Sequence, residues 1–282
     1  NLVCLAAFLR PYEAVIAADS AHICVHETGA IEATGHKVCP VLTKDGKLTP
    51  DLIRPVLDMH ENEHWVDPRL VYVSNPTEVG TVYTKEELED LYAFCKRHDL
   101  YFYIDGARLA AALAAKEETH LTFPDLPKLC DAFYIGGTKV GAMFGEALVL
   151  VNENFKERFR FNMKQKGAIL AKGWFLGVQF EELFKNKLYI EAGAHSIAMM
   201  KPIKEAFEKA GIPLLCEAPT NQIFPIFPNA LADEINKKYL TTFQCKPDKD
   251  HTCLRFCTSW ATNENAVKDF VEDFEEMCNR LL

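Results

Sequence analysis

The fold of this chain is decided by Tyr101-Phe-Tyr-Ile-Asp105-Gly106-Ala-Arg108 and by a second segment of similar design, Ala132-Phe-Tyr-Ile-Gly136-Gly137-Thr138-Lys139. Each segment begins with apolar and aromatic residues typical of a buried strand, and each ends in glycine and polar residues. In open α/β sheets, ligands bind beyond the carboxyl ends of the strands. The two segments therefore predict an α/β fold with a ligand site where Asp105 and Lys139 leave the sheet.

Other short apolar runs alternate with helical patterns along the first half of the chain. This alternation indicates a largely parallel sheet flanked by helices. The last two runs are separated only by a Gly-rich loop, so we expect them to pair as antiparallel neighbours and to add one reversed strand. The strands are predicted at residues 14–18, 38–42, 70–74, 101–104, 132–135 and 146–151.

The clearest helix begins at Lys85 and should end near His98. Thr84 can cap its first amides, and Glu87 can reach back to complete a capping box. A second helix is expected over residues 1–10, where the chain has no initiator Met and an amphipathic pattern is already under way. We therefore expect the sequence to lack an N-terminal segment.

The second half of the chain predicts a smaller unit, joined to the first by helices. The pattern is helical from Asn154 to about Ala210. We expect a large domain over residues 1–165, followed by bridging helices and a small C-terminal α/β domain over residues 166–282. The elements predicted in the small domain are strands at 223–227 and 253–258, a helix near 230–238 and a closing helix from Asn263.

The composition is that of an ordinary folded protein, with 282 residues of which 49% are hydrophobic and 25% charged. The formal net charge is −9 and no long run of Lys and Arg occurs, so nucleic acid is not an expected partner. No stretch approaches the roughly 20 apolar residues of a membrane span. The first residues also lack the features of a signal peptide. We therefore expect a cytoplasmic protein with no membrane partner.

The ten cysteines are spread through the chain, mostly within apolar runs. A chain of this length does not need disulfides to fold, so reduced and buried thiols are expected. Cys253 and Cys257 lie four residues apart in a strand-like segment, which places them on one face. No second pair has the spacing of zinc ligands, so a metal site is not expected.

Asp105 and Lys139 are the ionisable residues that the two strand ends present. An acid and a base at the ends of apolar strands are costly to bury unless they are paired or used. Pyridoxal phosphate would use both: a lysine amine forms a Schiff base with its aldehyde, and a carboxylate keeps its pyridine nitrogen protonated. The alternative is a solvated lysine and an aspartate that caps the turn at Gly106. Spacing alone favours this structural alternative.

The blocks Ile104-Asp-Gly-Ala-Arg-Leu109 and Tyr134-Ile-Gly-Gly-Thr-Lys-Val-Gly141 resemble the signature segments of the low-specificity threonine aldolase and β-eliminating lyase family. They occur in the family's order and at a family-like separation. Lys164-Gln-Lys-Gly-Ala-Ile-Leu-Ala-Lys-Gly173 and Leu254-Arg255-Phe-Cys-Thr-Ser-Trp260 are also similar to family segments. The resemblance implies the aspartate-aminotransferase fold of type I pyridoxal-phosphate enzymes, with pyridoxal 5'-phosphate as cofactor.

The resemblance also implies roles for single residues. Lys139 would carry the cofactor as a Schiff base, Asp105 would face its pyridine nitrogen, and Arg108 would lie near its phenolic oxygen. Arg255 would bind the α-carboxylate of the substrate, because a planar guanidinium meets both oxygens at once. Taken alone, an arginine in an apolar strand is more often part of a structural ion pair.

Two histidines, His22 and His26, lie in one short segment. A lone histidine is usually structural, but His22 matches the family's histidine that stacks over the cofactor ring, and we prefer it to His26. In the aldolase reaction that the resemblance implies, His22 or a water molecule that it orients would take the proton of the substrate β-hydroxyl.

The sequence departs from the family pattern in two places. The turn that binds the cofactor phosphate in family members would lie immediately before Asn1. We therefore expect phosphate contacts from Thr138 and from a neighbouring subunit, for which the basic stretch Lys164 to Lys166 is a candidate. In Asn75-Pro-Thr-Glu78-Val-Gly80, Glu78 stands where some threonine aldolases have a histidine near the substrate hydroxyl.

The resemblance thus predicts a lyase that cleaves β-hydroxy-α-amino acids, first threonine and allo-threonine, to glycine and an aldehyde. A homodimer or homotetramer is expected, because the active site of this fold lies near the subunit interface. Two alternatives stay open. One is a β-eliminating lyase that acts on a Cys, Ser or aromatic amino acid, and the other is a truncated subunit without activity.

Overall fold

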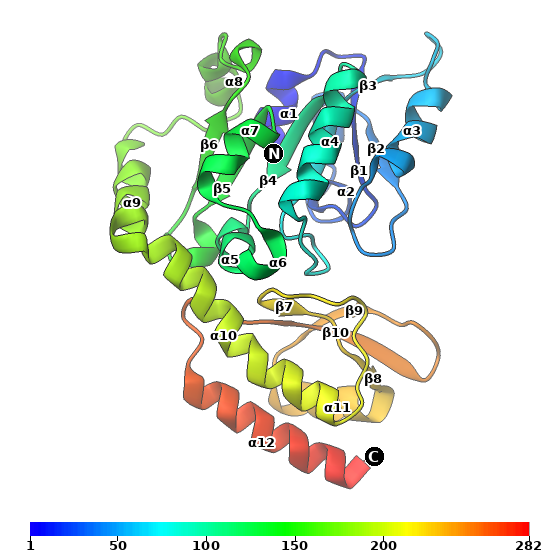
Figure 1. The fold of residues 1–282 in the computed structure, drawn as a ribbon, viewed down its shortest axis with the longest axis vertical. Coiled ribbons are helices and arrows are strands. Elements are labelled where there is room, and N and C mark those ends of the chain that lie inside the picture. The colour runs from blue at the N-terminus through cyan, green and yellow to red at the C-terminus, as the bar shows by residue number, and fades with distance from the viewer. Residues whose placement is uncertain (282) are drawn as a thin grey trace.

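The larger of two sheets has six strands in the order β2-β1-β3-β4-β5-β6 (Figure 1). The computed structural model describes residues 1–281. Neighbouring strands run parallel except β5 and β6, which are antiparallel. The predicted α/β fold and its reversed last strand are therefore confirmed. The strands are β1 Glu13–Ala18, β2 Val38–Val41, β3 Asp67–Ser74, β4 Tyr101–Asp105, β5 Ala132–Gly136 and β6 Glu146–Leu150.

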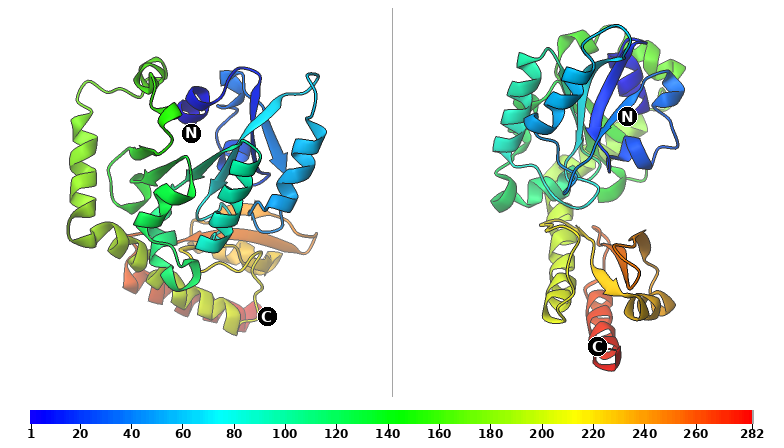
Figure 2. Two further views of the ribbon diagram at one scale, coloured as in Figure 1. Left: turned by 45° about the horizontal axis from the view of Figure 1, so that its top comes forward. Right: turned by 90° about the vertical axis from the view of Figure 1, so that its right-hand side faces the viewer.

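Helices flank this sheet on both faces (Figure 2). β1 is buried along its whole length and β3 over most of it, as expected of strands covered on two sides. None of the helices in residues 1–281 is long and apolar enough to cross a membrane. The helices of this part are α1 Leu2–Phe8, α2 His22–Val25, α3 Pro50–Met59, α4 Lys85–Arg97, α5 Leu109–Ala114, α6 Lys116–Thr119 and α7 Leu126–Leu129.

The predicted capping box of α4 is present. The backbone N–H of Glu87 donates to Thr84 Oγ1 at 3.2 Å, and the backbone N–H of Thr84 donates to Glu87 Oε2 at 2.9 Å. Both bonds satisfy amides that the first turn of a helix leaves free. The helix ends at Arg97, with His98 as its C-cap, as the sequence predicted.

The helical stretch predicted from Asn154 to Ala210 is divided into three helices. These are α8 Phe159–Gln165, α9 Trp174–Phe184 and α10 Leu188–Lys209. Gly167 has φ +78° after α8, and Asn186 and Lys187 have φ of 52° and 64° before α10. A left-handed backbone ends an α-helix, so the predicted helical stretch is interrupted at these points.

The smaller sheet is built around β10, His251–Cys257, to which three other strands pair antiparallel. The predicted run 223–227 is in fact two strands, because Pro225 lies between them and has no N–H to donate. β9 was not predicted; its four residues are largely exposed and form no apolar run. The remaining elements are β7 Gln222–Ile223, β8 Ile226–Pro228, β9 Thr242–Cys245, α11 Asn229–Lys238 and α12 Glu264–Leu281.

Each sheet has its own apolar core, and α10 takes part in both. Tyr189 belongs to the core of the large sheet, and Met200 to the core of the small one. Figure 1 shows α10 running from the large sheet to the small one, beside α12. We propose the division into residues 1–165 and 166–282, with the bridging helices in the second part, on the basis of these separate sheets and cores.

All ten cysteines are free thiols, and five of them are fully buried. Cys253 and Cys257 lie on β10, where residues two apart share a face. Within residues 1–281, no group of three or more His, Cys, Asp or Glu side chains is arranged to hold a metal ion.

Candidate active site

The ends of β4 and β5 approach each other closely at two glycines. The backbone N–H of Gly136 donates to Gly106 O at 2.9 Å. A Cβ on Gly106 would lie 1.9 Å from Tyr134 O, and one on Gly136 would lie 2.4 Å from Ala107 O. Only glycine permits this contact, which brings the residues after both strands to one place.

A cavity of about 290 Å³ opens beyond these strand ends. It contains most of the residues that the sequence singled out, and it lies at the carboxyl edge of the sheet where α/β proteins bind ligands. The lining residues are Asn1, His22, Ser74, Pro76, Thr77, Glu78, Asp105, Ala107, Arg108, Tyr134, Thr138, Lys139 and Glu146.

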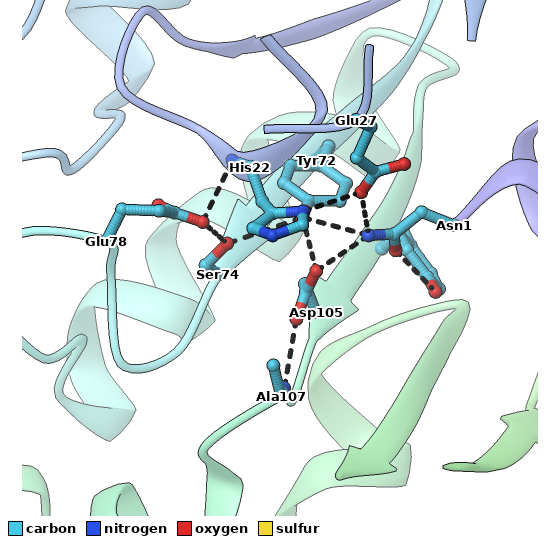
Figure 3. Close-up of polar contacts among 9 residues, drawn as sticks. Asn1, His22, Glu27, Tyr72, Ser74, Glu78, Asp105 and Ala107 are labelled. Atoms are coloured by element: carbon cyan, nitrogen blue, oxygen red, sulfur yellow. Dashed lines mark hydrogen bonds and ion pairs between the residues drawn. The ribbon is translucent and has the colours of Figure 1, made fainter. Parts of the chain in front are cut away.

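Asp105 is the last residue of β4, and its side chain is buried, with 2% exposure. It accepts hydrogen bonds from the hydroxyl of Tyr72, from Asn1 Nδ2 at 2.9 Å and from the backbone N–H of Ala107 at 2.9 Å (Figure 3). All three donors are neutral. Among residues 1–281 it has no cationic partner, so the charge of this carboxylate is oriented but not neutralised.

Lys139 lies in the short 3-10 helix Thr138–Val140 that follows β5. Among residues 1–281 its amine has neither a hydrogen bond nor an ion pair. Burial of the amine and the nearby charge of Arg108 lower the pKa of Lys139. A lowered pKa increases the fraction of neutral amine, the form that reacts with a carbonyl carbon.

Arg108 lies next to the lysine and also faces the small sheet. Its Nη2 is 4.0 Å from the sulfur of Cys257 on β10. Thr138 lines the cavity as well, but its hydroxyl donates to Glu146 Oε1 at 3.0 Å, while the backbone N–H of Gly137 donates to Glu146 Oε2 at 2.6 Å. Burial raises the pKa of Glu146. Glu146 thus orients the turn that carries Thr138 and Lys139.

His22 begins α2 and lines the cavity, whereas His26 is not among its lining residues. His22 Nδ1 lies 2.9 Å from Glu27 Oε1, which also accepts a hydrogen bond from Asn1 Nδ2 at 2.7 Å. The hydrogen bond to Glu27 raises the pKa of His22. The structure therefore gives His22 a fixed ring position and a carboxylate partner.

Arg255 is not among the residues lining this cavity. It lies on β10 between Cys253 and Cys257, on the face they share. Cys253 packs beside Val79 of the large-domain part, and Cys257 lies near Arg108, so this face is turned toward the large sheet. Arg255 Nε is buried without a hydrogen-bond partner. Arg255 lines a second cavity, of about 250 Å³, together with Cys257, whose sulfur approaches Arg108 of the first cavity.

Several residues of the site were missed from the sequence. Tyr72 and Ser74 lie on β3, which pairs with β4 so that Ser74 is opposite Asp105. The sequence could have indicated both residues, because they are polar residues near the end of a predicted strand that neighbours β4. Asn1, Glu27 and Glu146 come from three separate segments, and only the folded chain brings them together.

Comparison with known proteins agrees with this geometry. A family model described as β-eliminating lyase matches residues 1–227. A low-specificity L-threonine aldolase of Pseudomonas aeruginosa is 28% identical over 97% of this chain and 79% of its own length. The structure of Leishmania major threonine aldolase has a TM-score of 0.96 and 48% identity, covering 99% of this chain and 81% of that chain. An aromatic aminotransferase of Pyrococcus horikoshii, 19% identical with a TM-score of 0.65 over 99% of this chain and 76% of its own, shares the fold.

The architecture is that of type I pyridoxal-phosphate enzymes, in which a mostly parallel sheet presents its ligand site at the strand ends. Within that class, the chain belongs to the β-eliminating lyase family, and its relatives are threonine aldolases. It is a carbon–carbon lyase, a pyridoxal-phosphate-dependent threonine aldolase or β-eliminating lyase. The family resemblance carried by the two signature blocks is confirmed.

The residues of the cavity fit pyridoxal phosphate. Asp105 is a buried acid that lacks a cationic partner among residues 1–281, as expected of a group that faces a protonated ring nitrogen. Lys139 offers an amine of lowered pKa at the same cavity. Outside the cavity lining, Arg255 on β10 has a buried Nε that makes no hydrogen bond in the described chain. A ligand that has an aldehyde, a protonated ring nitrogen and an anionic group would satisfy these groups together.

Proposed function

We propose that this chain cleaves threonine, allo-threonine and related β-hydroxy-α-amino acids to glycine and an aldehyde. The observation that carries the proposal is the placement of Asp105 and Lys139 on one cavity, neither with an oppositely charged partner within residues 1–281. The threonine aldolases of Leishmania major and Pseudomonas aeruginosa, to which the chain is similar, support the same reaction. When bound, pyridoxal phosphate would withdraw electrons from the α-carbon of the substrate.

Four residues are proposed to hold the cofactor. The Lys139 amine would bind its aldehyde carbon covalently, and Asp105 would accept a hydrogen bond from its ring nitrogen. Arg108 would lie near the phenolic oxygen, and Thr138 would contribute to the phosphate site. The hydrogen bonds from Tyr72, Asn1 and Ala107 keep Asp105 in place before any ligand arrives, so little reorganisation is required on binding.

Arg255 is proposed to bind the α-carboxylate of the amino acid. Its unpartnered Nε and its position on the face of β10 toward the large sheet support this role. A guanidinium can donate two parallel hydrogen bonds to a carboxylate, which orients the substrate as well as attracting it. Orientation decides which bond at the α-carbon is weakened, and here it would be the bond to Cβ.

His22 is proposed to pack against the cofactor ring and to assist proton transfer at the β-hydroxyl, directly or through a water molecule. Its Nδ1 faces Glu27, which leaves Nε2 as the nitrogen able to face the cavity. Glu27 and Asn1 hold the ring in this position. His22 therefore combines a fixed orientation with a titratable group.

A subunit contact is part of the proposal. Apolar side chains stay exposed on α8, on α9 and in the loop before β6, and such surfaces mark association sites. Met143 and Phe144 follow closely on the turn that carries Lys139, which agrees with a homodimer or homotetramer, in which the basic residues Lys164 and Lys166 could reach a neighbouring phosphate. A cytoplasmic location is also proposed. The exposed apolar residues are Met143, Phe144, Phe161, Trp174 and Phe175.

The first test is the absorbance of the chain with added pyridoxal phosphate, followed by borohydride reduction and peptide mass mapping. We expect the adduct on Lys139 and none in Lys139→Ala, while Lys128→Ala, which alters an exposed lysine outside the cavity, should keep it. An adduct on another lysine would contradict the assignment.

A substrate panel then separates aldol cleavage from β-elimination, the reaction in the description of the matching family. Glycine with acetaldehyde from threonine would support the aldolase. Pyruvate with ammonia from serine or cysteine would support the eliminating lyase, and no product from any member of the panel would support an inactive subunit.

A further inference from the structure

Glu78 is an ionisable residue of the cavity to which the proposed reaction has so far given no role. Its Oε1 accepts hydrogen bonds from the backbone N–H of His22 at 2.9 Å and from Ser74 Oγ at 2.6 Å (Figure 3). Its Oε2 has no hydrogen-bond partner among residues 1–281. One oxygen thus fixes the carboxyl group, and the other stays free on the cavity that contains Lys139.

Both sheets hold the loop that carries Glu78. Gln222 Nε2, on β7 of the small sheet, donates to the backbone carbonyl of Glu78 at 2.6 Å, and Thr220 Oγ1 donates to that of Gly80 at 2.8 Å. Gly80 has φ +87°, and a Cβ there would lie 2.2 Å from Gln222 O. The loop is therefore fixed in place, and the position of the free oxygen is set by the fold.

The surroundings of Glu78 make its carboxylate a stronger base than an exposed glutamate. Burial, together with the negative charge of Asp105, raises the pKa of Glu78, although the hydrogen bonds from Ser74 and His22 oppose the shift. A carboxyl group whose pKa is moved toward neutrality is a better general acid and base at physiological pH. The other titratable groups on the cavity are His22, Asp105, Arg108, Tyr134, Lys139 and Glu146.

His22 is less suited to accept a proton. Its hydrogen bond to Glu27 raises its pKa and so stabilises the imidazolium, which has no lone pair to offer. The same bond occupies Nδ1. Glu78 has an unoccupied acceptor atom instead.

Resting on the proposed aldol cleavage, we propose that Glu78 is a catalytic residue whose Oε2 takes the proton of the substrate β-hydroxyl. The hydroxyl O–H bond breaks, its electron pair forms the second C–O bond of the aldehyde, and the Cα–Cβ pair stays on the α-carbon. The α-carbon gains one proton to give glycine, and Glu78 releases one, so the cycle is balanced. Glu78 thus takes the place of His22 as the group that accepts this proton, and His22 positions Glu78 through its backbone N–H.

The test compares two reactions of one enzyme. Aldol cleavage of allo-threonine needs the hydroxyl proton to be removed, whereas exchange of the α-hydrogen of glycine with deuterium from solvent does not. Glu78→Gln keeps an oxygen for Ser74 and His22 but has no basic Oε2. We expect kcat for cleavage to fall about 10²- to 10⁴-fold, the range of general acid–base catalysis, while glycine exchange and the cofactor absorbance stay within about twofold.

Two further variants complete this comparison. Glu78→Asp keeps the carboxyl group on a shorter side chain and should restore part of the cleavage rate. Glu89→Gln makes the same chemical change at an exposed position on α4 outside the cavity and should leave both reactions unchanged. Equal loss of cleavage and exchange in Glu78→Gln would make Glu78 structural and overturn the inference.

A measurement without cofactor tests the electrostatic basis. A carboxyl group with a raised folded pKa stabilises the fold below its unfolded pKa, and this stability is lost as the pH rises through the folded pKa. Glu78→Gln cannot ionise, so its unfolding midpoint should rise relative to the native chain as the pH increases from the unfolded carboxyl pKa of about 4.3 through the raised folded pKa. A constant difference would contradict the raised pKa.

The outcomes separate the two proposals. If the native chain cleaves allo-threonine and Glu78→Gln does so at a similar kcat with the same pH profile, only the inference on Glu78 is wrong. If the native chain binds the cofactor and exchanges glycine but cleaves no β-hydroxy-α-amino acid, the proposed function is wrong and the inference falls with it.

Discussion

The two sides of the cavity differ in how their charges are satisfied. On one side, the acidic groups Asp105, Glu27 and Glu78 are held by hydrogen bonds from neighbouring side chains and amides. On the other, Lys139 on the cavity and Arg255 on β10 are cationic side chains without an anionic partner among residues 1–281. The acidic side is assembled before a ligand binds, and the cationic side is left for the anionic groups of a ligand. The acidic residues are thus already held in position, whereas the cationic residues are free to bind a ligand.

The largest expected effect on the rate of cleavage comes from removing the amine of Lys139. Lys139→Ala should reduce cleavage by more than about 10⁴-fold, a large part of the acceleration of 10⁶-fold or more that enzymes provide, because no other lysine lines the cavity in the described chain. Stopped assays of glycine formation would measure the loss. A residual rate within about tenfold of the native rate would show that the open side is not the reactive one.

The next largest effect on the rate is expected from Asp105, one of the acidic residues that hydrogen bonds hold in place. Asp105→Asn keeps the shape of the side chain and removes its charge, so kcat should fall about 10²- to 10³-fold, the range for one preorganised electrostatic contact. The spectrum of bound cofactor should change with it, because a neutral amide no longer favours a protonated ring nitrogen. Steady-state kinetics with spectral titration would check both. An unchanged spectrum with a normal kcat would contradict the role of Asp105.

Arg255→Lys tests whether the cationic side needs a guanidinium or only a charge. The variant loses one of two charge-assisted hydrogen bonds, so KM for allo-threonine should rise about 10- to 100-fold, equivalent to roughly 1.5 to 3 kcal/mol. Affinity for pyridoxal phosphate alone should not change. If cofactor affinity falls instead, Arg255 contacts the cofactor and not the substrate carboxylate.

The smallest effect is expected from Glu27→Gln. The hydrogen bond to Glu27 raises the pKa of His22, so the pair stabilises the fold below the unfolded histidine pKa of about 6.5. This stability is lost as the pH rises through the folded pKa. Because His22 is 42% exposed in its side chain, the gain should be at most about 1 kcal/mol. Urea unfolding of both proteins at about pH 5.5 and about pH 8.5 would detect it, and a difference that grows with pH would contradict the sign.

Much of the large sheet could be predicted because the signals were local. Apolar runs bounded by glycine and polar residues marked all six strands, and the capping pattern of Thr84 and Glu87 marked α4. The predictions of secondary structure were wrong where no local sequence pattern marks the element. Asn186 and Lys187 break the helical stretch in a left-handed conformation that neither residue requires. β9 is exposed, so it has no apolar run to reveal it.

The sequence by itself determined the class of fold, the family, and the positions of Asp105 and Lys139, because strand ends and signature blocks are contiguous in the chain. Only the tertiary structure decided that Glu27 and Asn1 bond to each other beside Asp105, and that Glu78 has one fixed and one free oxygen. These contacts join residues 26 to 104 positions apart. Such pairings arise from the packing of the elements against one another, and no local pattern encodes them.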